Sequence, residues 1–330
     1  MDLIRATNEG LYCPVGDFYI DPWRPVANAI ITHAHADHAH WGSRQYYSSA
    51  KCAPLLQLRL GEDLPLQTYL PSEKFPMGKT WVSFHPAGHI LGSSQVRIEY
   101  GSHVWVASGD YKRTPDPSCD PFEVVPCDTF ISEATFALPV YQWDRGEVTA
   151  KKILEWWQQD QERPSLLFCY ALGKAQRILA ELARLTDRTI YIHGALEAIT
   201  NIYRHAGVKM LPTASIFDHD KGYSFKGDLI LAPPSAHRSP WMKRFKEPQT
   251  AFASGWMLVR GTRRRKGYEK GFALSDHADW NELNQTIQET QAQTIFLTHG
   301  RTDVLQRYLT EQGKTVRLFQ TEYDAHEEAS

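Results

Sequence analysis

Short apolar segments separated by turn residues dominate the first part of the chain. Strand-like runs cover 26–33, 81–89, 94–100, 103–110 and 129–135, and Gly, Pro, Ser or Asp residues bound them. Such runs between turn residues are typical of β-strands. The pattern therefore predicts a β-rich domain up to about residue 136.

From residue 148 onward, helical and strand-like segments alternate. Apolar residues recur at helical spacing over 148–161, 173–185 and 195–207, whereas 165–172, 189–194 and 228–234 are strand-like. Strands that alternate with helices indicate a parallel sheet built from βαβ units. Near the end, 294–300 is strand-like again and contains a histidine. We expect an α/β insertion over 137–270, followed by the return of the first domain over 271–330.

Composition agrees with an ordinary globular protein. The chain has 330 residues, of which 42% are hydrophobic and 22% charged, enough for a large domain and a smaller insertion. An apolar run near membrane-spanning length is absent, and residues 1–20 lack the apolar core of a signal peptide. The five cysteines are scattered without a C-x-x-C pair, which favours reduced thiols and a cytoplasmic location, away from membranes.

Net charge changes this picture only locally. The formal charge of −2 is not that of a general nucleic-acid binder. Basic residues nevertheless concentrate between Lys243 and Lys270, including Arg260 and the run 263–266, with Trp241, Phe245, Trp256 and Tyr268 interleaved. This stretch is either a solvated charged face or a surface on which bases stack while cations hold phosphates.

The segment THAHADHAHWG (32–42) carries the strongest chemical signal. It places His33, His35, Asp37 and His38 directly after a predicted strand. In an extended segment His33 and His35 point the same way, and Asp37 and His38 follow on the next turn. Imidazole and carboxylate are ligands for Zn, Mn or Fe. The spacing predicts a metal site.

Three later residues complete this set. His89 lies in a Gly-flanked loop, Asp110 follows a strand, and His299 lies near a strand end. Taken singly, each is more often a structural or turn residue. In this order after the first cluster they fit a site for two divalent cations, in which an aspartate can bridge both ions.

The ordered motifs resemble those of the metallo-β-lactamase superfamily, specifically its β-CASP nucleic-acid-processing branch. FYIDPWRP (18–25), SEATF (132–136), ALGKAQ (171–176), SGWM (254–257) and ALSDHADW (273–280) carry the resemblance along the chain. Within that branch, SEATFALPVYQW is similar to the bacterial ligase-associated DNA-damage-response exonucleases, which resemble Artemis and Apollo in architecture. The resemblance implies an α/β fold: an αββα sandwich formed by 1–136 and 271–330, with a compact β-CASP domain inserted at 137–270.

The resemblance also implies roles for individual residues. One ion would be held by His33, His35 and His89, and the other by Asp37, His38 and His299, with Asp110 bridging them. A shared hydroxide would then attack the phosphorus in line. The implied catalytic residues are Asp37, His277 and Glu133, and Asp21 would support the ligands from behind.

His277 is expected to act on the leaving 3′-oxygen, either as general acid or as a phosphate contact. Glu133 would orient it, with Asp276 as the rival for that role. A terminal 5′-phosphate would be bound by Lys174 at a helix start and by Ser254, whose ordinary interpretations are a surface lysine and a turn serine. Ser235 and His237 are weaker candidates.

The implied function is 5′-to-3′ exonuclease digestion of single-stranded DNA in DNA repair, alongside an ATP-dependent DNA ligase and a helicase. Three alternatives remain open. A β-CASP ribonuclease would use the same ligands. A thioester hydrolase like glyoxalase II shares the first motif but predicts no large insertion between Asp110 and His299. A non-catalytic scaffold would have no reason to keep seven ligands.

Overall fold

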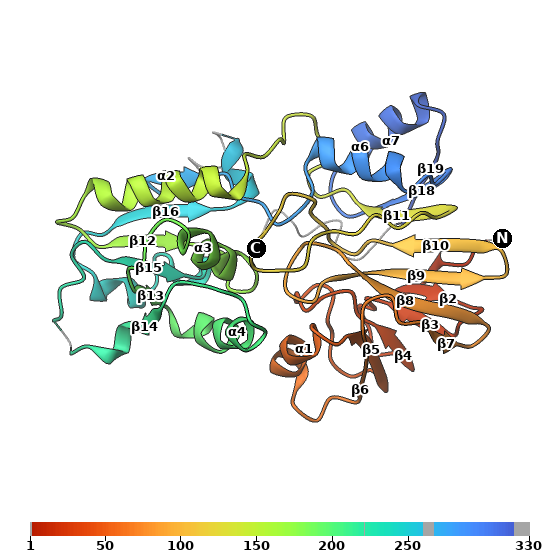
Figure 1. Ribbon diagram of the computed structural model, residues 1–330, viewed down its shortest axis with the longest axis horizontal. Coiled ribbons are helices and arrows are strands. Elements are labelled where there is room, and N and C mark those ends of the chain that lie inside the picture. The colour runs from red at the N-terminus through yellow and green to blue at the C-terminus, as the bar shows by residue number, and fades with distance from the viewer. Residues whose placement is uncertain (1, 221, 260–266, 320–330) are drawn as a thin grey trace. The chain divides into compact units, whose positions relative to one another are not determined.

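The computed structural model describes residues 2–220, 222–259 and 267–319. Arg260 and the run 263–266 of the predicted basic stretch lie outside this part of the chain, as do residues 321–330, whose polar composition predicts a loose tail. The chain forms two compact units (Figure 1): Met1–Arg113, Asp120–Gln142 and His277–Ser330 make the first, and Thr114–Cys119 with Trp143–Asp276 make the second. The main junctions fall at 142/143 and 276/277, and the short segment Thr114–Cys119 adds two more. The sequence predicted junctions at 136/137 and 270/271.

The first unit contains two sheets. One has the order β1 (Arg5–Ala6), β2 (Leu11–Cys13), β3 (Phe18–Ile20), β4 (Asn28–Ile30), β5 (Gln45–Ser49) and β6 (Leu66–Tyr69). The other has the order β19 (Thr315–Leu318), β18 (Thr294–Thr298), β11 (Thr129–Glu133), β10 (His103–Ala107), β9 (Ser94–Tyr100), β8 (Thr80–Pro86) and β7 (Phe75–Met77). Strands β7 to β10 pair antiparallel, and β10, β11, β18 and β19 pair parallel.

Alternating side chains of the second sheet bury both of its faces. On one face Val96 and Ile98 pack in a common core with Ile20 and Ile30 of the first sheet, so the two sheets face each other. On the opposite face, Phe130 and its neighbours pack against helices α6 (Trp280–Glu289) and α7 (Thr302–Glu311). Figure 1 shows these two helices beside β11 and β18, and α1 (Ala53–Leu60) near β5.

The second unit is built on one parallel sheet. Its order is β14 (Thr213–Ser215), β13 (Ile190–Ile192), β15 (Leu229–Ala232), β12 (Ser165–Phe168), β16 (Gln249–Ala253) and β17 (Lys270–Phe272). Helices α2 (Gly146–Gln159), α3 (Lys174–Leu182) and α4 (Gly194–His205) belong to this unit, as do the 3₁₀ turns η1 (Ile216–Asp218), η2 (Pro234–Ala236), η3 (Pro240–Arg244) and η4 (Gly255–Leu258). Ile153 and Trp157 of α2 face the core of this sheet at helical spacing.

The mixed α/β architecture predicted from the sequence is confirmed, and each predicted strand and helix has a counterpart. Some counterparts are shorter. β12 ends at Phe168 rather than 172, and Gly173, with a φ of 91°, then turns the chain into α3. In the first sheet, the predicted strand 26–33 corresponds to β4, and the other strands were not predicted. Strands β7, β14, β16, β17 and β19 and helices α1, α6 and α7 were not predicted either. Within the described residues, none of the helices is long and apolar enough to cross a membrane.

Candidate metal centre

The loop after β4 carries the first group of imidazoles. A turn closes it, with the backbone N–H groups of His38 and Ala39 donating to the carbonyl oxygen of His35 at 3.2 and 3.0 Å. His33 is buried and His35 half-buried, and His33 Nε2 lies 3.1 Å from His35 Nδ1. Close approach of two ring nitrogens is the arrangement that a shared cation requires.

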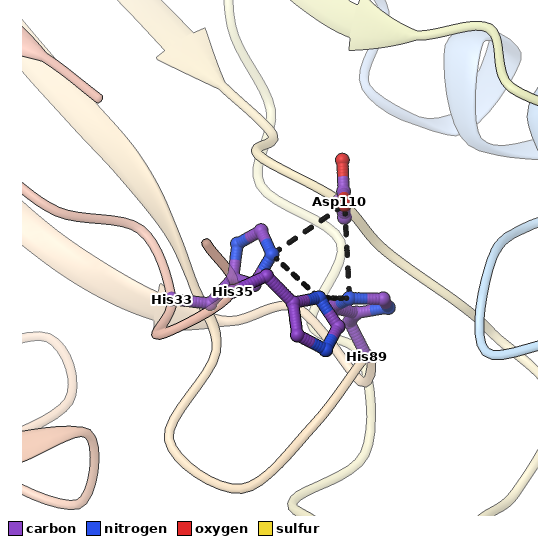
Figure 2. A group of neighbouring side chains, drawn as sticks. All are labelled: His33, His35, His89 and Asp110. Atoms are coloured by element: carbon purple, nitrogen blue, oxygen red, sulfur yellow. Dashed lines mark hydrogen bonds and ion pairs between the residues drawn. The ribbon is translucent and has the colours of Figure 1, made fainter. Parts of the chain in front are cut away.

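Two further loops bring His89 and Asp110 to the same place (Figure 2). His89 Nε2 lies 3.0 Å from His35 Nδ1, and Asp110 Oδ2 lies 3.4 Å from His33 Nε2 and 3.7 Å from His89 Nε2. One ligand atom from each of these four residues falls within 4.8 Å of all the others. The structure therefore gathers three imidazoles and one carboxylate from three segments that are distant in sequence.

A glycine with a positive φ angle directly precedes each of these two candidate ligands. Gly109, just before Asp110, has a φ of 56°, and a Cβ there would meet Thr32 at 2.7 Å. Gly88, just before His89, has a φ of 75°, and a Cβ there would meet the carbonyl oxygen of Lys112 at 2.2 Å. Any larger residue would be strained and crowded at these positions, so the ligand loops need glycine.

A second group surrounds the same carboxylate oxygen. His38 Nε2 lies 3.4 Å from Asp110 Oδ2 and 3.7 Å from Asp37 Oδ2. The His299 ring stacks with the His38 ring at 5.4 Å between centroids. A cavity of the first unit is lined by Asp37, His38 and His299, together with Asp21 and Trp23. Asp110 Oδ2 thus stands between the two groups of imidazoles.

Asp21 fixes the orientation of His38. Its Oδ2 lies 2.7 Å from His38 Nδ1 and accepts a hydrogen bond from the Thr32 hydroxyl at 2.6 Å, while its Oδ1 accepts from the Thr32 N–H at 2.8 Å. With Nδ1 held by Asp21, Nε2 of His38 is the atom aimed at the carboxylates. The part played by Thr32 was not foreseen, since a threonine beside a histidine carries no distinctive pattern.

Arg59 was also not foreseen. Its Nε donates to the carbonyl oxygen of Ala34 at 2.6 Å and so attaches helix α1 to the histidine loop. Nothing in the local sequence signals this contact, because it joins positions far apart in the chain. It helps to hold His33 and His35 in place.

The pKa values of the two histidines nearest to Asp110 are shifted in opposite directions. Burial lowers the pKa of His33, and His38 lowers it further, so His33 is held neutral. Burial would also lower the pKa of His38, but Asp110, Asp37 and Asp21 together raise it well above its usual value. Burial raises the pKa of Asp110, yet the imidazoles, His38 first, hold it well below its ordinary value. The carboxylate is therefore ionised, and a cation that binds His38 displaces a proton.

These residues fit a divalent metal. Among the described residues, His38 Nε2 is buried without a hydrogen-bond partner, which leaves a ligand atom aimed at the carboxylates. Neutral imidazole nitrogens and ionised carboxylate oxygens are the donors that Zn, Mn and Fe accept. The clusters hold donors for metal ions, and the donor set does not select one element among them.

His277 lies beside this group. Its Nδ1 is 2.9 Å from Glu133 Oε2 and 3.9 Å from Asp110 Oδ2. Glu133 is buried at the end of β11, and its Oε1 accepts a hydrogen bond from the Tyr111 N–H at 2.7 Å. Glu133 thus has a fixed position and contacts His277. Asp276, the rival in the sequence analysis, pairs with Lys174 at 2.6 Å and Arg177 at 3.2 Å.

The residues suggested for the terminal phosphate are buried in the second unit. Lys174 is 3% exposed and its ammonium pairs with Asp276, so it is not the surface lysine of the ordinary interpretation. Ser254 is 1% exposed, and its N–H donates to the carbonyl oxygen of Phe272 at 3.0 Å. Ser235 is exposed, and His237 is half-buried with its ring stacked on Tyr268. A phosphate role for Lys174 would require exchange of its carboxylate partner.

Comparison with known proteins adds two sequence relatives. A protein named Probable DNA ligase from Opitutus terrae is 27% identical over 316 residues, which is 93% of this chain and 30% of that protein. Integrator complex subunit 11 from Danio rerio is 33% identical over 106 residues, which is 31% of this chain and 17% of that protein. The chain therefore spans less than a third of the length of these curated relatives.

Comparison of structures identifies a similar fold. The crystal structure of a protein of unknown function from Enterococcus faecalis V583 superposes with a TM-score of 0.61 at 12% identity, and the match covers 89% of this chain and 79% of the other. At that identity the likeness concerns the fold alone. No protein-family model matches the chain. The sequence relatives support the metallo-β-lactamase resemblance loosely and do not distinguish one branch of that superfamily from another.

Proposed function

We propose that the chain is a metal-dependent phosphodiesterase that degrades single-stranded DNA from its 5′ end. The observation that carries this proposal is the position of Asp110 Oδ2, within 3.7 Å of ring nitrogens of His33, His89 and His38. One carboxylate oxygen between two groups of imidazoles is the arrangement that a pair of divalent ions requires.

The fold supports the same proposal. The chain has two facing sheets with helices on an outer face, interrupted by a parallel α/β unit. This is the architecture that we would expect of a metallo-β-lactamase sandwich with an inserted β-CASP domain. We accordingly assign 1–136 and 271–330 to the sandwich and 137–270 to the inserted domain, with each boundary defined to within several residues.

The chain's own residues would divide the work as follows. His33, His35 and His89 would hold one ion, and Asp37, His38 and His299 the other, with Asp110 shared. Bound divalent ions supply positive charge to the phosphate oxygens and lower the pKa of water. The ionised Asp37 carboxylate, whose pKa is raised by burial but lowered overall by His38, is available to accept a proton.

His277 would supply the proton that the leaving 3′-oxygen needs during hydrolysis. As the oxygen of water bonds to phosphorus, the P–O3′ bond breaks and the 3′-oxygen takes a proton from His277. Glu133 accepts a hydrogen bond from Nδ1, which leaves Nε2 as the atom that gives up the proton. The products are a 5′-mononucleotide and a strand shortened by one residue that carries a new 5′-phosphate.

The choice of DNA rests on the relative named Probable DNA ligase. The match covers 30% of that protein's length, and its name points to a DNA-related context. As partners of this chain we propose an ATP-dependent DNA ligase and a helicase of the same repair pathway, in the cytoplasm.

We expect 5′-to-3′ digestion with a preference for a 5′-phosphate over a 5′-hydroxyl. A terminal phosphate dianion forms charge-assisted hydrogen bonds worth about 1.5–3 kcal/mol each, so its loss should weaken productive binding by one to two orders of magnitude. The measurement is digestion of 5′-labelled and 3′-labelled single strands, each of DNA and RNA and with either 5′ end, in Mn, Zn or Mg.

A labelled mononucleotide released first from the 5′-labelled DNA would agree with the proposal. Release first from the 3′-labelled strand would contradict the 5′-to-3′ polarity. Equal rates with either 5′ end would contradict the preference for a 5′-phosphate. Faster digestion of RNA would replace it with the ribonuclease alternative. Lys174→Ala adds a separate comparison: loss of the 5′-phosphate preference at unchanged thermal stability would support a phosphate contact, and an unchanged preference would assign Lys174 to the ion pair alone.

A further inference from the structure

Exposed aromatic rings gather on one part of the second unit. Phe217 in η1 is 66% exposed and Tyr223 is 41% exposed. Side chains of this size are usually much more deeply buried. These two rings, together with His219 and Arg244, are called here the aromatic platform.

The members of the aromatic platform are held against one another. The Tyr223 and His219 rings stack at 3.8 Å with an interplanar angle of 11°. The Arg244 guanidinium lies 5.3 Å from the centre of the Phe217 ring, and its Nη2 donates to the carbonyl oxygen of His219 at 2.8 Å. The Phe217 and Tyr223 rings are thereby each held by a neighbouring side chain while they remain exposed.

Buried residues support the aromatic platform from behind. Phe225 is 2% exposed and lies 4.8 Å from the Tyr223 ring, and the Tyr191 hydroxyl is 2.8 Å from His219 Nε2. A ring that is already fixed loses little conformational freedom when another flat group stacks on it. The aromatic platform is thus prepared to receive planar groups.

Cations accompany the aromatic rings of the platform. Lys243 and Lys246 are exposed on either side of Arg244 in the chain. Acidic residues also occur in this region, namely Asp218, Asp220 and Glu247, and Asp218 Oδ2 accepts a hydrogen bond from the Ser215 N–H at 3.0 Å. Separate rings with cations beside them suit alternating bases and phosphates.

We propose that the aromatic platform binds single-stranded nucleic acid, with bases on Phe217 and Tyr223 and phosphates on Lys243 and Arg244. This is a binding surface separate from the metal-binding residues of the first unit, and its DNA substrate rests on the proposed function. Lys243 and Arg244 of the predicted basic and aromatic stretch 243–270 belong to this surface, whereas Phe245 is buried.

The test uses metal-loaded protein and a 3′-fluorescein-labelled thymidine 20-mer with phosphorothioate linkages, which resist hydrolysis. Fluorescence anisotropy gives its affinity. Phe217→Ala and Tyr223→Ala should each weaken binding about tenfold, the typical effect of removing a stacked ring. Lys243→Ala should reduce the slope of log affinity against log salt by about 0.7, the effect of one phosphate contact on a single strand.

Trp81→Ala is the matched control, because Trp81 is a 51% exposed aromatic residue on β8 of the first unit. It should bind like the unchanged protein. Platform variants that bind as tightly as Trp81→Ala would overturn the proposal, as would a loss confined to duplex DNA. An equal loss with a uridine 20-mer would support a surface that recognises stacked bases in either sugar series. Should Phe217→Ala fail to fold, Phe217→Leu removes the ring while keeping an apolar side chain.

Hydrolysis of thymidine 5′-(p-nitrophenyl phosphate) separates this proposal from the proposed function. The small substrate offers one base and one phosphodiester, so the platform variants should hydrolyse it at the unchanged rate. If the variants lose strand binding and the unchanged protein hydrolyses neither substrate, the proposal of the aromatic platform is supported and the proposed nuclease function is excluded. If the variants bind the strand normally and hydrolysis is also normal, the proposed nuclease function is supported and the proposal of the aromatic platform is excluded.

Discussion

Asp110→Asn protein is expected to lose phosphodiester hydrolysis by more than two orders of magnitude while remaining folded. Replacement of a residue that merely supports a ligand costs about 10–100-fold in metal affinity or activity. Asp110 Oδ2 lies within 3.7 Å of ring nitrogens on both groups of imidazoles, so its loss should exceed that range. The substitution keeps the size of the side chain and removes its charge.

The measurement is the hydrolysis rate together with the metal content per chain. Asp110→Asn and His35→Ala should both contain fewer than two ions per chain. Asp63→Asn, which changes an exposed aspartate of the same unit, should match the unchanged protein in both respects. Full activity in folded Asp110→Asn would exclude a site for two ions at this carboxylate.

His277→Ala is expected to slow the chemical step by about 10²–10⁴-fold, the usual contribution of a positioned general acid. The proton is needed only as the 3′-oxygen leaves, so the loss should fall on kcat, and strand binding should change little. Because the hydrogen bond to Glu133 fixes the ring, Glu133→Gln should show a smaller loss of the same kind.

Single-turnover kinetics and metal analysis check this expectation. His103→Ala, a change at an exposed histidine of β10, serves as the control and should leave kcat unchanged. Asp110, Glu133 and His277 also offer atoms within 4.8 Å of one another. If His277→Ala loses a metal ion, His277 is a ligand and the place of His299 in the second group must be revised.

Which side chains gather at the candidate site was largely predictable, because they occur in a fixed order along the chain; their roles as ligands stay a prediction. The motif THAHADH indicates the first group. The strands that precede His89, Asp110 and His299 end at the same edge of the second sheet. The position of Asp110 between both groups was implied only by the family resemblance, because the contacts of its Oδ2 with His33, His38 and His89 depend on how β4, β8 and β10 pack. The contact of Glu133 with His277 joins residues 144 positions apart.

Burial was the least predictable property. Lys174 follows a glycine at a helix start, a pattern typical of a surface lysine, yet the structure places it opposite Asp276. Phe245 belongs to a basic stretch and is nonetheless in the core, whereas Phe217 and Tyr223 are exposed in a segment without a basic run. Tertiary packing decides these cases, and local composition does not encode it.

Helix α6 carried a signal that was overlooked. Asp279 accepts a hydrogen bond from the Glu282 N–H at 2.9 Å and so caps the helix that begins at Trp280. An aspartate followed three residues later by a glutamate is a usual sign of a helix start. His277 lies in the same segment, so a candidate catalytic residue and a helix-capping pattern overlap within six residues.

The most direct test of the central claim is to measure bound metal and hydrolysis on the same sample. The protein is stripped with a chelator and then titrated with Mn or Zn, while single-stranded DNA digestion is followed. We predict that the stripped protein is inactive and that activity returns as about two ions bind per chain. Undiminished digestion by protein shown to be free of metal would contradict the account.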